Sequence, residues 1–316
     1  MNIRLVYTLL HVAAQLARRT LPISLPNEII WCKDDNKDYY HWPVAYWARW
    51  IDDNRESLDC VFPWFRVYRD ASPLYLRELI EAVTSHLEAV RVHDASYILL
   101  CDSLYPELLL ATEDPPVGIT VLGDLSNFKR LSVSVIGSRK ASPVAIEESY
   151  RVGSILANNN YTVVSGGAYG CDIAAHMGAL SASRCNYCPT LAVMAGGLAS
   201  FSPRGNRAII DRMVQKGGAV ISERLWWASP RPYDFPIRNR IISGLCKATV
   251  LVQGGDPSGA MVTAQLALDQ GRDVLVFDPP SRELYGGNHR LMSEGAPVYK
   301  SEKELLDLIR EYIIVG

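Results

Sequence analysis

The sequence has almost no net charge, because its 34 acidic residues slightly outnumber its 32 basic ones and give a formal charge of −2. This excludes a protein that attracts nucleic acid through a general positive field, so any polyanion must meet a local basic patch.

Long apolar runs are missing too. The apolar residues 3–17 are interrupted by His11 and Gln15 and followed by Arg18 and Arg19, without a small-residue cleavage site. We expect a helix there rather than a signal peptide or membrane span, and therefore a cytoplasmic protein with no membrane partner.

Familiar catalytic and nucleotide-binding motifs are also absent. The chain contains no G-x-x-x-x-G-K-[ST] P-loop, no G-x-G-x-x-G fingerprint, no nucleophile elbow and no paired carboxylates. Cysteine occurs seven times, but the C-x-x-C pair of Cys185 and Cys188 has no second pair to complete a zinc site. Without a secretion signal, the cysteines are predicted to be reduced thiols. These absences favour binding over catalysis, and we expect no catalytic residue, no metal and no cofactor.

The central part of the chain reads as strand, glycine turn, helix, strand, glycine turn and helix. The strands are predicted at residues 133–136 and 163–164, which are apolar and β-branched. The first helix should begin with Pro143, since proline is favoured at the first helical position, and the second should begin near Asp172. The result is a βαβ unit. Both of its glycine turns follow the carboxyl ends of parallel strands, where open α/β sheets bind ligands.

The same alternation continues on both sides of this unit. Over about 200 residues it predicts a doubly wound α/β fold with a mostly parallel sheet. Further strands are predicted at residues 97–101, 119–122, 190–194, 219–222, 248–252 and 274–277, and further helices at 206–216, 262–269 and 302–314. The proline-rich residues 226–240 are predicted to form an irregular loop.

The first part of the chain has a different composition. Residues 1–95 show apolar residues at helical spacing and hold five of the seven tryptophans, at positions 31, 42, 47, 50 and 64. Such rings could stack on bases, although packing in a core is the commoner use of tryptophan. We predict two domains: a mostly helical, aromatic-rich accessory domain at 1–95 and the α/β domain at 96–316.

The glycine turns predict an anion site, most plainly for phosphate. Glycine lets backbone N–H groups approach an anion, and each helix start adds a favourable dipole. Arg139 stands directly on the first turn, where it would offer a bidentate fork to phosphate; a surface salt bridge is the alternative use of such an arginine. Other arginines follow the ends of later strands. The candidate phosphate-binding residues are Gly137, Ser138, Arg139, Ser165, Gly166, Gly167, Gly170, Arg204, Asn206, Arg207, Arg238, Asn239, Arg240, Ser258 and Gly259.

The order of short motifs over about residues 97–300 resembles the DNA-processing protein A family (DprA, also called Smf). A single G-S-R turn would be weak support, whereas many motifs in the same order are specific. The matching pieces are Y-P at 105–106, D-P-P at 114–116, V-I-G-S-R at 135–139, V-S-G-G-A-Y-G-C-D at 164–172, A-V-M-A-G-G-L at 192–198, S-P-R-G-N at 202–206, S-E at 222–223, F-P-I-R-N-R-I-I-S-G-L at 235–245, S-G at 258–259 and G-N at 287–288.

This resemblance implies an extended Rossmann-like domain that binds single-stranded DNA, forms a homodimer and loads a RecA-type recombinase during natural transformation. By resemblance, Arg139 would grip the DNA backbone, and Arg204 stands where family members often have a lysine that contacts it. The chain departs from the family pattern at Gly167, where leucine is common, and at Tyr169, where a basic residue is common. The lost charge at Tyr169 is expected to weaken DNA binding.

A nucleotide-binding sensor or a phosphoribohydrolase-like enzyme acting on nucleoside monophosphates stays open as an alternative on the same superfold. Enzymes of that kind use P-G-G-x-G-T-x-x-E, in which the glutamate acts on the ribosyl bond. Here the spacing after Gly254 is broken, and Gln265 stands near where the carboxylate should be. An amide cannot replace a carboxylate as an acid or base. We expect a packing or turn-bonding role for His176, a surface or capping role for Glu223, and a binding protein rather than an enzyme.

Overall fold

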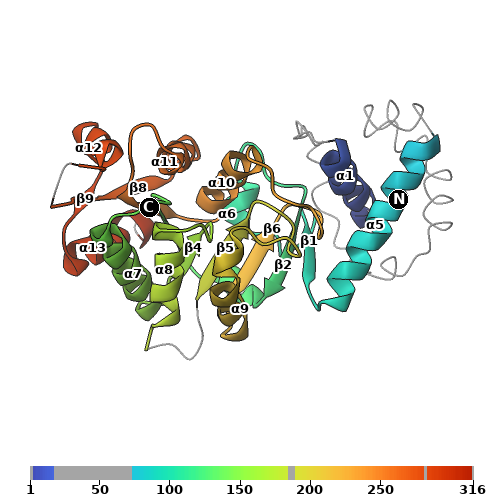
Figure 1. The fold of residues 1–316 in the computed structure, drawn as a ribbon, viewed down its shortest axis with the longest axis horizontal. Coiled ribbons are helices and arrows are strands. Elements are labelled where there is room, and N and C mark those ends of the chain that lie inside the picture. The colour runs from blue at the N-terminus through green and yellow to red at the C-terminus, as the bar shows by residue number, and fades with distance from the viewer. Residues whose placement is uncertain (1–2, 18–72, 184–188, 281–282, 315–316) are drawn as a thin grey trace.

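The structure is a computed structural model that describes residues 3–17, 73–183, 189–280 and 283–314 (Figure 1). Within those ranges, no helix is both long and apolar enough to cross a bilayer. The predictions for the five tryptophans at positions 31 to 64 and for the Cys185 and Cys188 pair fall outside the described residues and stay predictions.

In the described part of the chain, nine strands form one sheet with the order β1-β2-β6-β5-β4-β3-β7-β8-β9. All neighbours pair in parallel except β2, which runs antiparallel to both β1 and β6. The predicted doubly wound, mostly parallel sheet is confirmed. The strands are β1 (Ser96–Leu99), β2 (Gly118–Gly123), β3 (Ser132–Gly137), β4 (Thr162–Ser165), β5 (Thr190–Met194), β6 (Ala219–Ser222), β7 (Ala248–Gln253), β8 (Asp273–Phe277) and β9 (Val298–Tyr299).

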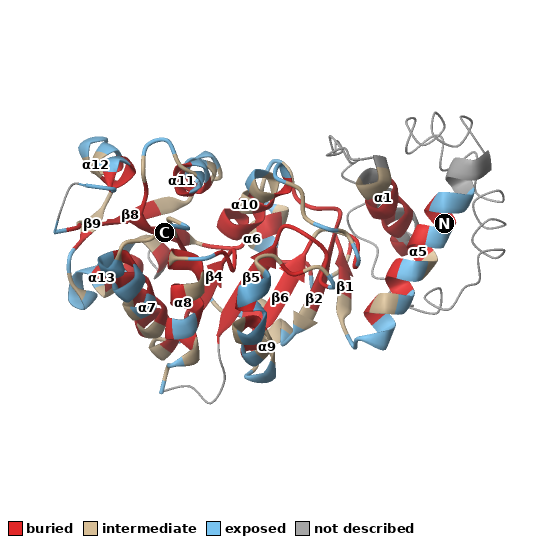
Figure 2. Cartoon of the chain, viewed as in Figure 1, coloured by how far each residue is buried: buried red, intermediate tan, exposed pale blue. Residues whose placement is uncertain are grey.

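Helices cover both faces of the sheet (Figure 1). One face carries α7 (Pro143–Asn158), α8 (Cys171–Leu180), α9 (Arg207–Gln215) and α13 (Glu302–Ile309), and the other carries α6 (Glu107–Leu110), α10 (Asp234–Gly244), α11 (Gly259–Asp269) and α12 (Gly286–Ser293). Successive strand residues serve opposite faces. Val133 and Val135 of β3 join the apolar cluster beneath α7, whereas Ile136 joins the cluster beneath α10. Most strand residues are accordingly buried, and the exposed residues lie mainly on the outer sides of the helices and in the loops (Figure 2).

Local sequence explains where the helices begin. Ser142 caps α7, since its hydroxyl accepts a hydrogen bond from the Ala145 N–H at 3.2 Å, and Pro143 occupies the first helical position as predicted. Just past the end of α7, Asn160 has a φ of 65°, a left-handed conformation that asparagine tolerates. Ser258 caps α11 in the same way, so that helix begins earlier than the predicted residue 262.

The prediction of an irregular loop over residues 226–240 is wrong in its second half, because α10 begins at Asp234. Pro236 lies in the first turn of this helix, where backbone N–H groups have no partner within the helix and a missing donor costs nothing. The error affects the site, since Arg238, Asn239 and Arg240 are presented by a regular helix and therefore point in different directions.

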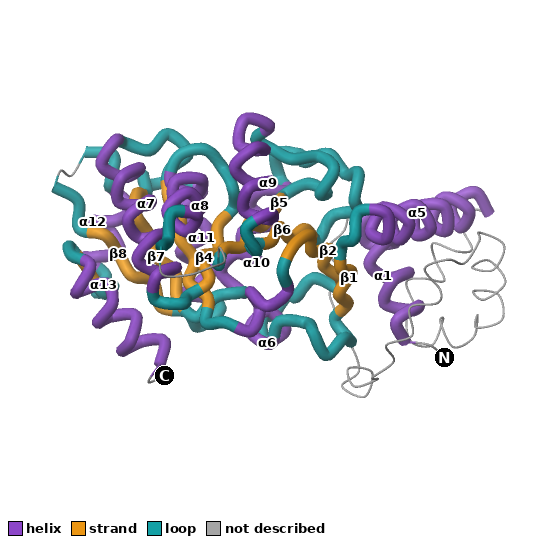
Figure 3. Tube along the Cα trace, turned by 90° about the horizontal axis from the view of Figure 1, so that it is seen from below, coloured by secondary structure: helices purple, strands orange, loops and turns teal. Residues whose placement is uncertain are grey.

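Two N-terminal helices, α1 (Ile3–Ala17) and α5 (Pro73–Val92), confirm the helical periodicity of their sequences. They lie beside the β1 end of the sheet in both views (Figures 1 and 3). Their contact with it is partly polar: His11 lies with its Nδ1 2.6 Å from the Tyr97 hydroxyl. One apolar cluster contains both Leu87 of α5 and Tyr97 of β1. The division of the chain at residue 95 thus stays a prediction, and this cluster spans it.

Two fully buried histidines are held in their neutral form. His86 accepts a hydrogen bond on Nδ1 from the Trp226 N–H at 3.1 Å, and His176 places Nδ1 2.8 Å from the Thr190 hydroxyl. Of the packing and turn-bonding roles expected for His176, the packing role is confirmed, since its hydrogen-bond partner Thr190 lies on β5 and not in a turn. Burial lowers the pKa of both His86 and His176 to about 3, because the charged ring would lose its water.

These histidines should make the fold acid-sensitive. In the unfolded chain their pKa is near the ordinary 6.5, so the unfolded state takes up protons first as the pH falls. Their contribution to stability is therefore complete above about pH 6.5 and is lost between there and about pH 3, by up to about 1.4 kcal/mol per pH unit for each ring. Urea unfolding at about pH 7.5 and pH 5.5 should show a smaller difference for His176→Gln than for the parent protein. An equal difference would contradict the assignment.

Candidate nucleic-acid interface

A pocket lies where the strand order reverses. From β3 the sheet continues through β4, β5 and β6 on one side and through β7, β8 and β9 on the other. The connections that leave the carboxyl ends of β3 and β7 diverge, and such a reversal opens a crevice in a doubly wound sheet. The crevice is a half-open pocket of about 700 Å³. We call it the carboxyl-edge pocket; its predicted residues are Gly137, Ser138, Arg139, Arg238, Asn239, Ser258 and Gly259.

Arg139 stands at the mouth of this pocket. Its side chain is exposed, and its guanidinium carbon lies 4.8 Å from the centre of the Phe235 ring, in a cation–π contact that holds it over the pocket. No carboxylate among the described residues forms an ion pair with it, so the alternative use of Arg139 in a surface salt bridge is not found there. The charge of Arg139 therefore faces solvent and is available to an anion.

Arg238 forms the floor of the pocket and is only 5% exposed. Its Nη1 donates to the Gly166 carbonyl at 2.8 Å and to the Val193 carbonyl. Asp172 accepts hydrogen bonds from the Gly166 N–H at 3.2 Å and the Ala168 N–H at 3.4 Å. Burial lowers the pKa of Arg238 to about 10, an effect that the Asp172 carboxylate opposes and the neighbouring Arg139 charge reinforces. Arg238 remains a cation at neutral pH and ties the end of β5 to the second glycine turn.

The two glycine turns touch each other. At Gly170, where φ is 78°, an added Cβ would lie 2.2 Å from the Ser138 carbonyl oxygen. The next residue, Cys171, donates its N–H to the same oxygen at 3.2 Å. A side chain at this position would push the turns apart, so glycine is required by the close approach of two backbones. This contact fixes the position of the first glycine turn, and of Arg139 on it, relative to the second turn.

Arg204 and Arg207 line a second, separate pocket of about 540 Å³ with Phe201. The guanidinium of Arg207 lies 4.3 Å from the centre of the Phe201 ring and pairs with Asp211 at 2.8 Å, so its charge is partly neutralised. No ion pair joins Arg204 to a carboxylate in the described ranges. Sequence analysis predicted one site, and the structure instead offers two basic pockets.

Tyr169 lies between these pockets. It follows Ala168, which lines the carboxyl-edge pocket, and a Cβ at Gly205 would come 2.7 Å from the Tyr169 hydroxyl oxygen. Gly205 adjoins Arg204 in the short helix η3 (Arg204–Asn206). The ring is 52% exposed and so presents a flat apolar surface between two cations.

Other predicted residues support the site from beneath. The Ser165 hydroxyl donates to the Val135 carbonyl at 2.6 Å, and the Asn206 amide donates to the Gly167 carbonyl at 2.9 Å, both in buried positions. Gly167 has a φ of 64°, in the left-handed region that favours glycine. The structure does not bring these side chains to the pocket surface.

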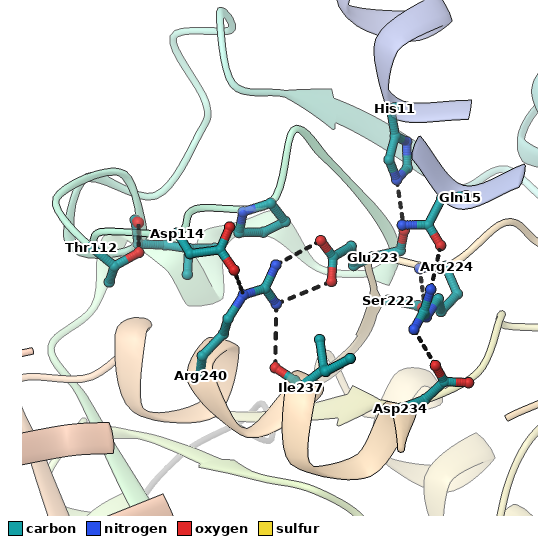
Figure 4. A network of polar contacts seen from close by, with 12 residues as sticks. His11, Gln15, Thr112, Asp114, Ser222, Glu223, Arg224, Asp234, Ile237 and Arg240 are labelled. Atoms are coloured by element: carbon teal, nitrogen blue, oxygen red, sulfur yellow. Dashed lines mark hydrogen bonds and ion pairs between the residues drawn. The ribbon is translucent and has the colours of Figure 1, made fainter. Parts of the chain in front are cut away.

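Arg240 does not line the carboxyl-edge pocket and points instead toward Glu223 and Asp114 (Figure 4). Its guanidinium forms a bidentate pair with Glu223, at 2.7 and 3.0 Å, and its Nε donates to Asp114 at 2.9 Å. Burial alone would lower the pKa of Arg240, but the two carboxylates raise it above its ordinary value. The Glu223 carbonyl also accepts a hydrogen bond from His11 Nε2 at 2.6 Å, which connects this network to α1. Arg240 and Glu223 are structural partners.

Sequence reasoning missed Phe235 and Asp172 as parts of the site. Phe235 was assigned to a loop, although its spacing from Arg238 and Asn239 is that of one helical turn. Asp172 was recognised only as the start of a helix. The available signal was an acidic residue next to a glycine turn in a buried segment, which requires a cation nearby.

Substitutions of Arg240 and Arg139 should have different effects on the stability of the fold. Arg240→Ala leaves the carboxylate of Glu223, whose side chain is only 15% exposed, without its partner and should lower the free energy of unfolding by about 3–5 kcal/mol. Arg139→Ala creates no cavity and should change it by less than about 0.5 kcal/mol. Urea denaturation measures both. An Arg240→Ala protein as stable as Arg139→Ala would mean that the network contributes nothing to the fold.

Comparison with known proteins gives a consistent result. Residues 96–310 match the family model described as DNA recombination-mediator protein A. Protein Smf of Borreliella burgdorferi is 35% identical over 216 residues, which is 68% of this chain and 67% of that protein. DNA processing protein DprA of Streptococcus pneumoniae is 34% identical over 236 residues, 74% of this chain and 80% of that protein. The match to Protein Smf of Escherichia coli, at 34% identity, spans 73% of this chain but only 60% of the relative.

Solved structures agree. The X-ray structure of DNA processing protein A from Streptococcus pneumoniae superposes with a TM-score of 0.64 at 31% identity, over 75% of this chain and 82% of that one. DNA processing protein A from Helicobacter pylori, described for its mode of binding single-stranded DNA, gives a TM-score of 0.62 at 26% identity, over 69% of this chain and 97% of that one.

Proposed function

The chain belongs to the DNA recombination-mediator protein A family, as its motifs predict, and from this premise we propose that it binds single-stranded DNA and acts in DNA processing. One observation carries the proposal: the exposed Arg139 guanidinium, unpaired by any described carboxylate, stands on a glycine turn at the reversal point of the sheet. A relative described as binding single-stranded DNA supports the same ligand.

The arrangement favours contacts to the DNA backbone over contacts to particular bases. A phosphate would rest between Arg139 and the backbone around Ser138, close to the N-terminus of α11, whose dipole favours an anion. The strand would then pass over Tyr169 to Arg204 in the second pocket. Phosphate contacts and stacking on a ring tolerate any base, so binding should vary little with sequence.

We propose further, from the family resemblance alone, that the protein forms a homodimer and delivers DNA to a RecA-type recombinase in the cytoplasm. Sedimentation equilibrium of the full chain tests the first part, with a mass of one chain as the contrary result. Strand exchange by a recombinase on protein-coated DNA tests the second, and an unchanged rate would contradict it.

We also propose that the protein catalyses no reaction. Gln265, which stands near where a phosphoribohydrolase would need its glutamate, is exposed on α11 and donates to Asp269 at 2.8 Å instead of lining the pocket. Incubation with nucleoside monophosphates, with or without Mg²⁺, should release no free base. Base release that disappears in an Asp172→Asn protein would favour the enzyme alternative.

The DNA proposal is tested with Arg139 and Arg204, neither of which pairs with a carboxylate among the described residues. Arg139→Ala and Arg204→Ala should each weaken binding to an oligothymidine about tenfold, because each removes a charge-assisted contact to phosphate. The slope of log affinity against log salt should fall by about one unit or less for each. Fluorescence anisotropy over a salt titration measures both quantities.

Arg77→Ala is the matched control, since Arg77 is an exposed arginine on α5, far along the chain from both pockets. It should bind like the parent protein. Parent-like affinity and salt slope in both Arg139→Ala and Arg204→Ala would place the DNA elsewhere.

Tyr169 allows a second test of the same path. Tyr169→Arg should raise affinity at low salt and steepen the salt slope by about one unit, since it adds a phosphate contact. Tyr169→Phe should bind like the parent, and Tyr169→Ala should lose about 1–3 kcal/mol of stacking free energy. Quenching of a fluorescent base analogue reports the stacking directly. Equal quenching by Tyr169→Ala and the parent would exclude Tyr169 from the path.

A further inference from the structure

A third pocket lies at the opposite edge of the sheet. It has a volume of about 690 Å³ and is lined by Ser132, which begins β3, and by Lys247, which precedes β7. Most of the remaining lining comes from the short helix η2 (Leu125–Lys129) with the residues after it, from the connection between β1 and α6, and from the start of α6. We call it the amino-edge pocket. The strands β3 and β7 run parallel, so this pocket and the carboxyl-edge pocket lie at opposite ends of these two strands.

Leucine is the residue type that occurs most often in the lining of the amino-edge pocket. Leu191 and Leu245 are buried beneath it, while Leu104 and Leu131 are 51% and 42% exposed at its surface. Large exposed aliphatic side chains that converge on one concave surface are characteristic of protein-binding sites, whereas scattered ones are unremarkable.

The charged residues of this pocket are mostly of one sign. Lys129, Arg130 and Lys247 line it together with one carboxylate, that of Glu107. Arg130 is held near the end of η2, where its guanidinium donates to the Ser126 hydroxyl at 3.1 Å. Within the described ranges, neither Lys129 nor Lys247 pairs with a carboxylate. The pocket thus combines an apolar surface with a basic rim on a chain whose net charge is −2.

We propose that the amino-edge pocket docks a short acidic segment of a partner protein. Aliphatic side chains of that segment would pack on Leu104 and Leu131, and its carboxylates would face Lys129 and Lys247. A nucleotide fits less well. The pocket has no glycine turn to offer backbone N–H groups, and the ring of Tyr105 is buried with its hydroxyl donated to the Pro116 carbonyl at 2.7 Å.

The position of the pocket allows this docking to occur together with the proposed DNA binding, although the docking itself does not depend on it. A partner bound at the amino edge leaves the carboxyl-edge pocket unobstructed, so the protein can hold two ligands at once. Charge complementarity at the rim would act chiefly on the association rate and on the choice of partner, and the aliphatic contacts would supply most of the affinity.

The probe is a fluorescein-labelled peptide with leucines one helical turn apart among glutamates and aspartates, titrated with the full chain in anisotropy measurements. Lys129→Glu combined with Lys247→Glu should weaken its binding at least about tenfold, and Leu131→Gln about fivefold. Leu131, Lys129 and the rim lie at the surface, so these proteins should unfold at the parent's temperature, which circular dichroism checks. Lys303→Glu, an exposed lysine on α13, is the matched control and should leave the affinity unchanged.

Three further measurements identify the occupant. A peptide with its acidic residues replaced by lysine should not bind, Arg139→Ala should not change the affinity for the acidic peptide, and an oligothymidine should not displace it. The proposal is overturned if the acidic peptide binds no better than its lysine counterpart, or if the Lys129→Glu and Lys247→Glu double variant retains parent affinity. Displacement of the peptide from the parent protein by oligothymidine, together with weaker oligothymidine binding by the double variant, would assign the pocket to nucleic acid and would also overturn the proposal.

Discussion

The buried guanidinium of Arg238 holds the carboxyl edge of the sheet together. It is hydrogen-bonded to main-chain carbonyl groups instead of to water. Arg238 extends from α10 to carbonyls that follow β4 and end β5, and Asp172 supplies the opposing charge from α8. Removing a charge from water costs several kcal/mol unless it is paired and hydrogen-bonded. The helix and the two strand ends therefore cannot separate without leaving that charge unpaired. The position of the second glycine turn, and of Arg139 above it, depends on this constraint.

Local patterns in the sequence were sufficient for the architecture. Short β-branched runs predicted the parallel strands and Pro143 predicted the start of α7, because each of these signals acts through its own backbone. The pattern failed at α10, where Pro236 indicates a helix break unless the residue happens to fall in the first turn. Whether Pro236 falls in the first turn depends on the residue at which α10 begins, and the spacing of apolar residues does not define that residue.

The site was predicted less completely, for a different physical reason. Arg139 and Arg240 look equivalent in the sequence, yet one faces solvent and the other is neutralised by Glu223 and by Asp114, which is 126 positions away. Only the folded sheet brings those carboxylates together. The same holds for His11, whose contact with the Glu223 carbonyl connects the first helix to a loop more than two hundred residues later. Sequence reveals which groups need partners, and topology decides which partners they get.

The reversed direction of β2 has a consequence for how the two edges communicate. Its entry loop brings Asp114 to the carboxyl edge, while its exit leads through Asp124 into η2 at the amino edge. This strand is hydrogen-bonded on both sides, to β1 and to β6, and a slip of one residue would turn its buried side chains outward. The strand β2 therefore cannot slide along its neighbours to carry a movement from one edge of the sheet to the other. Ligands at its two ends should bind additively, with a coupling free energy near zero.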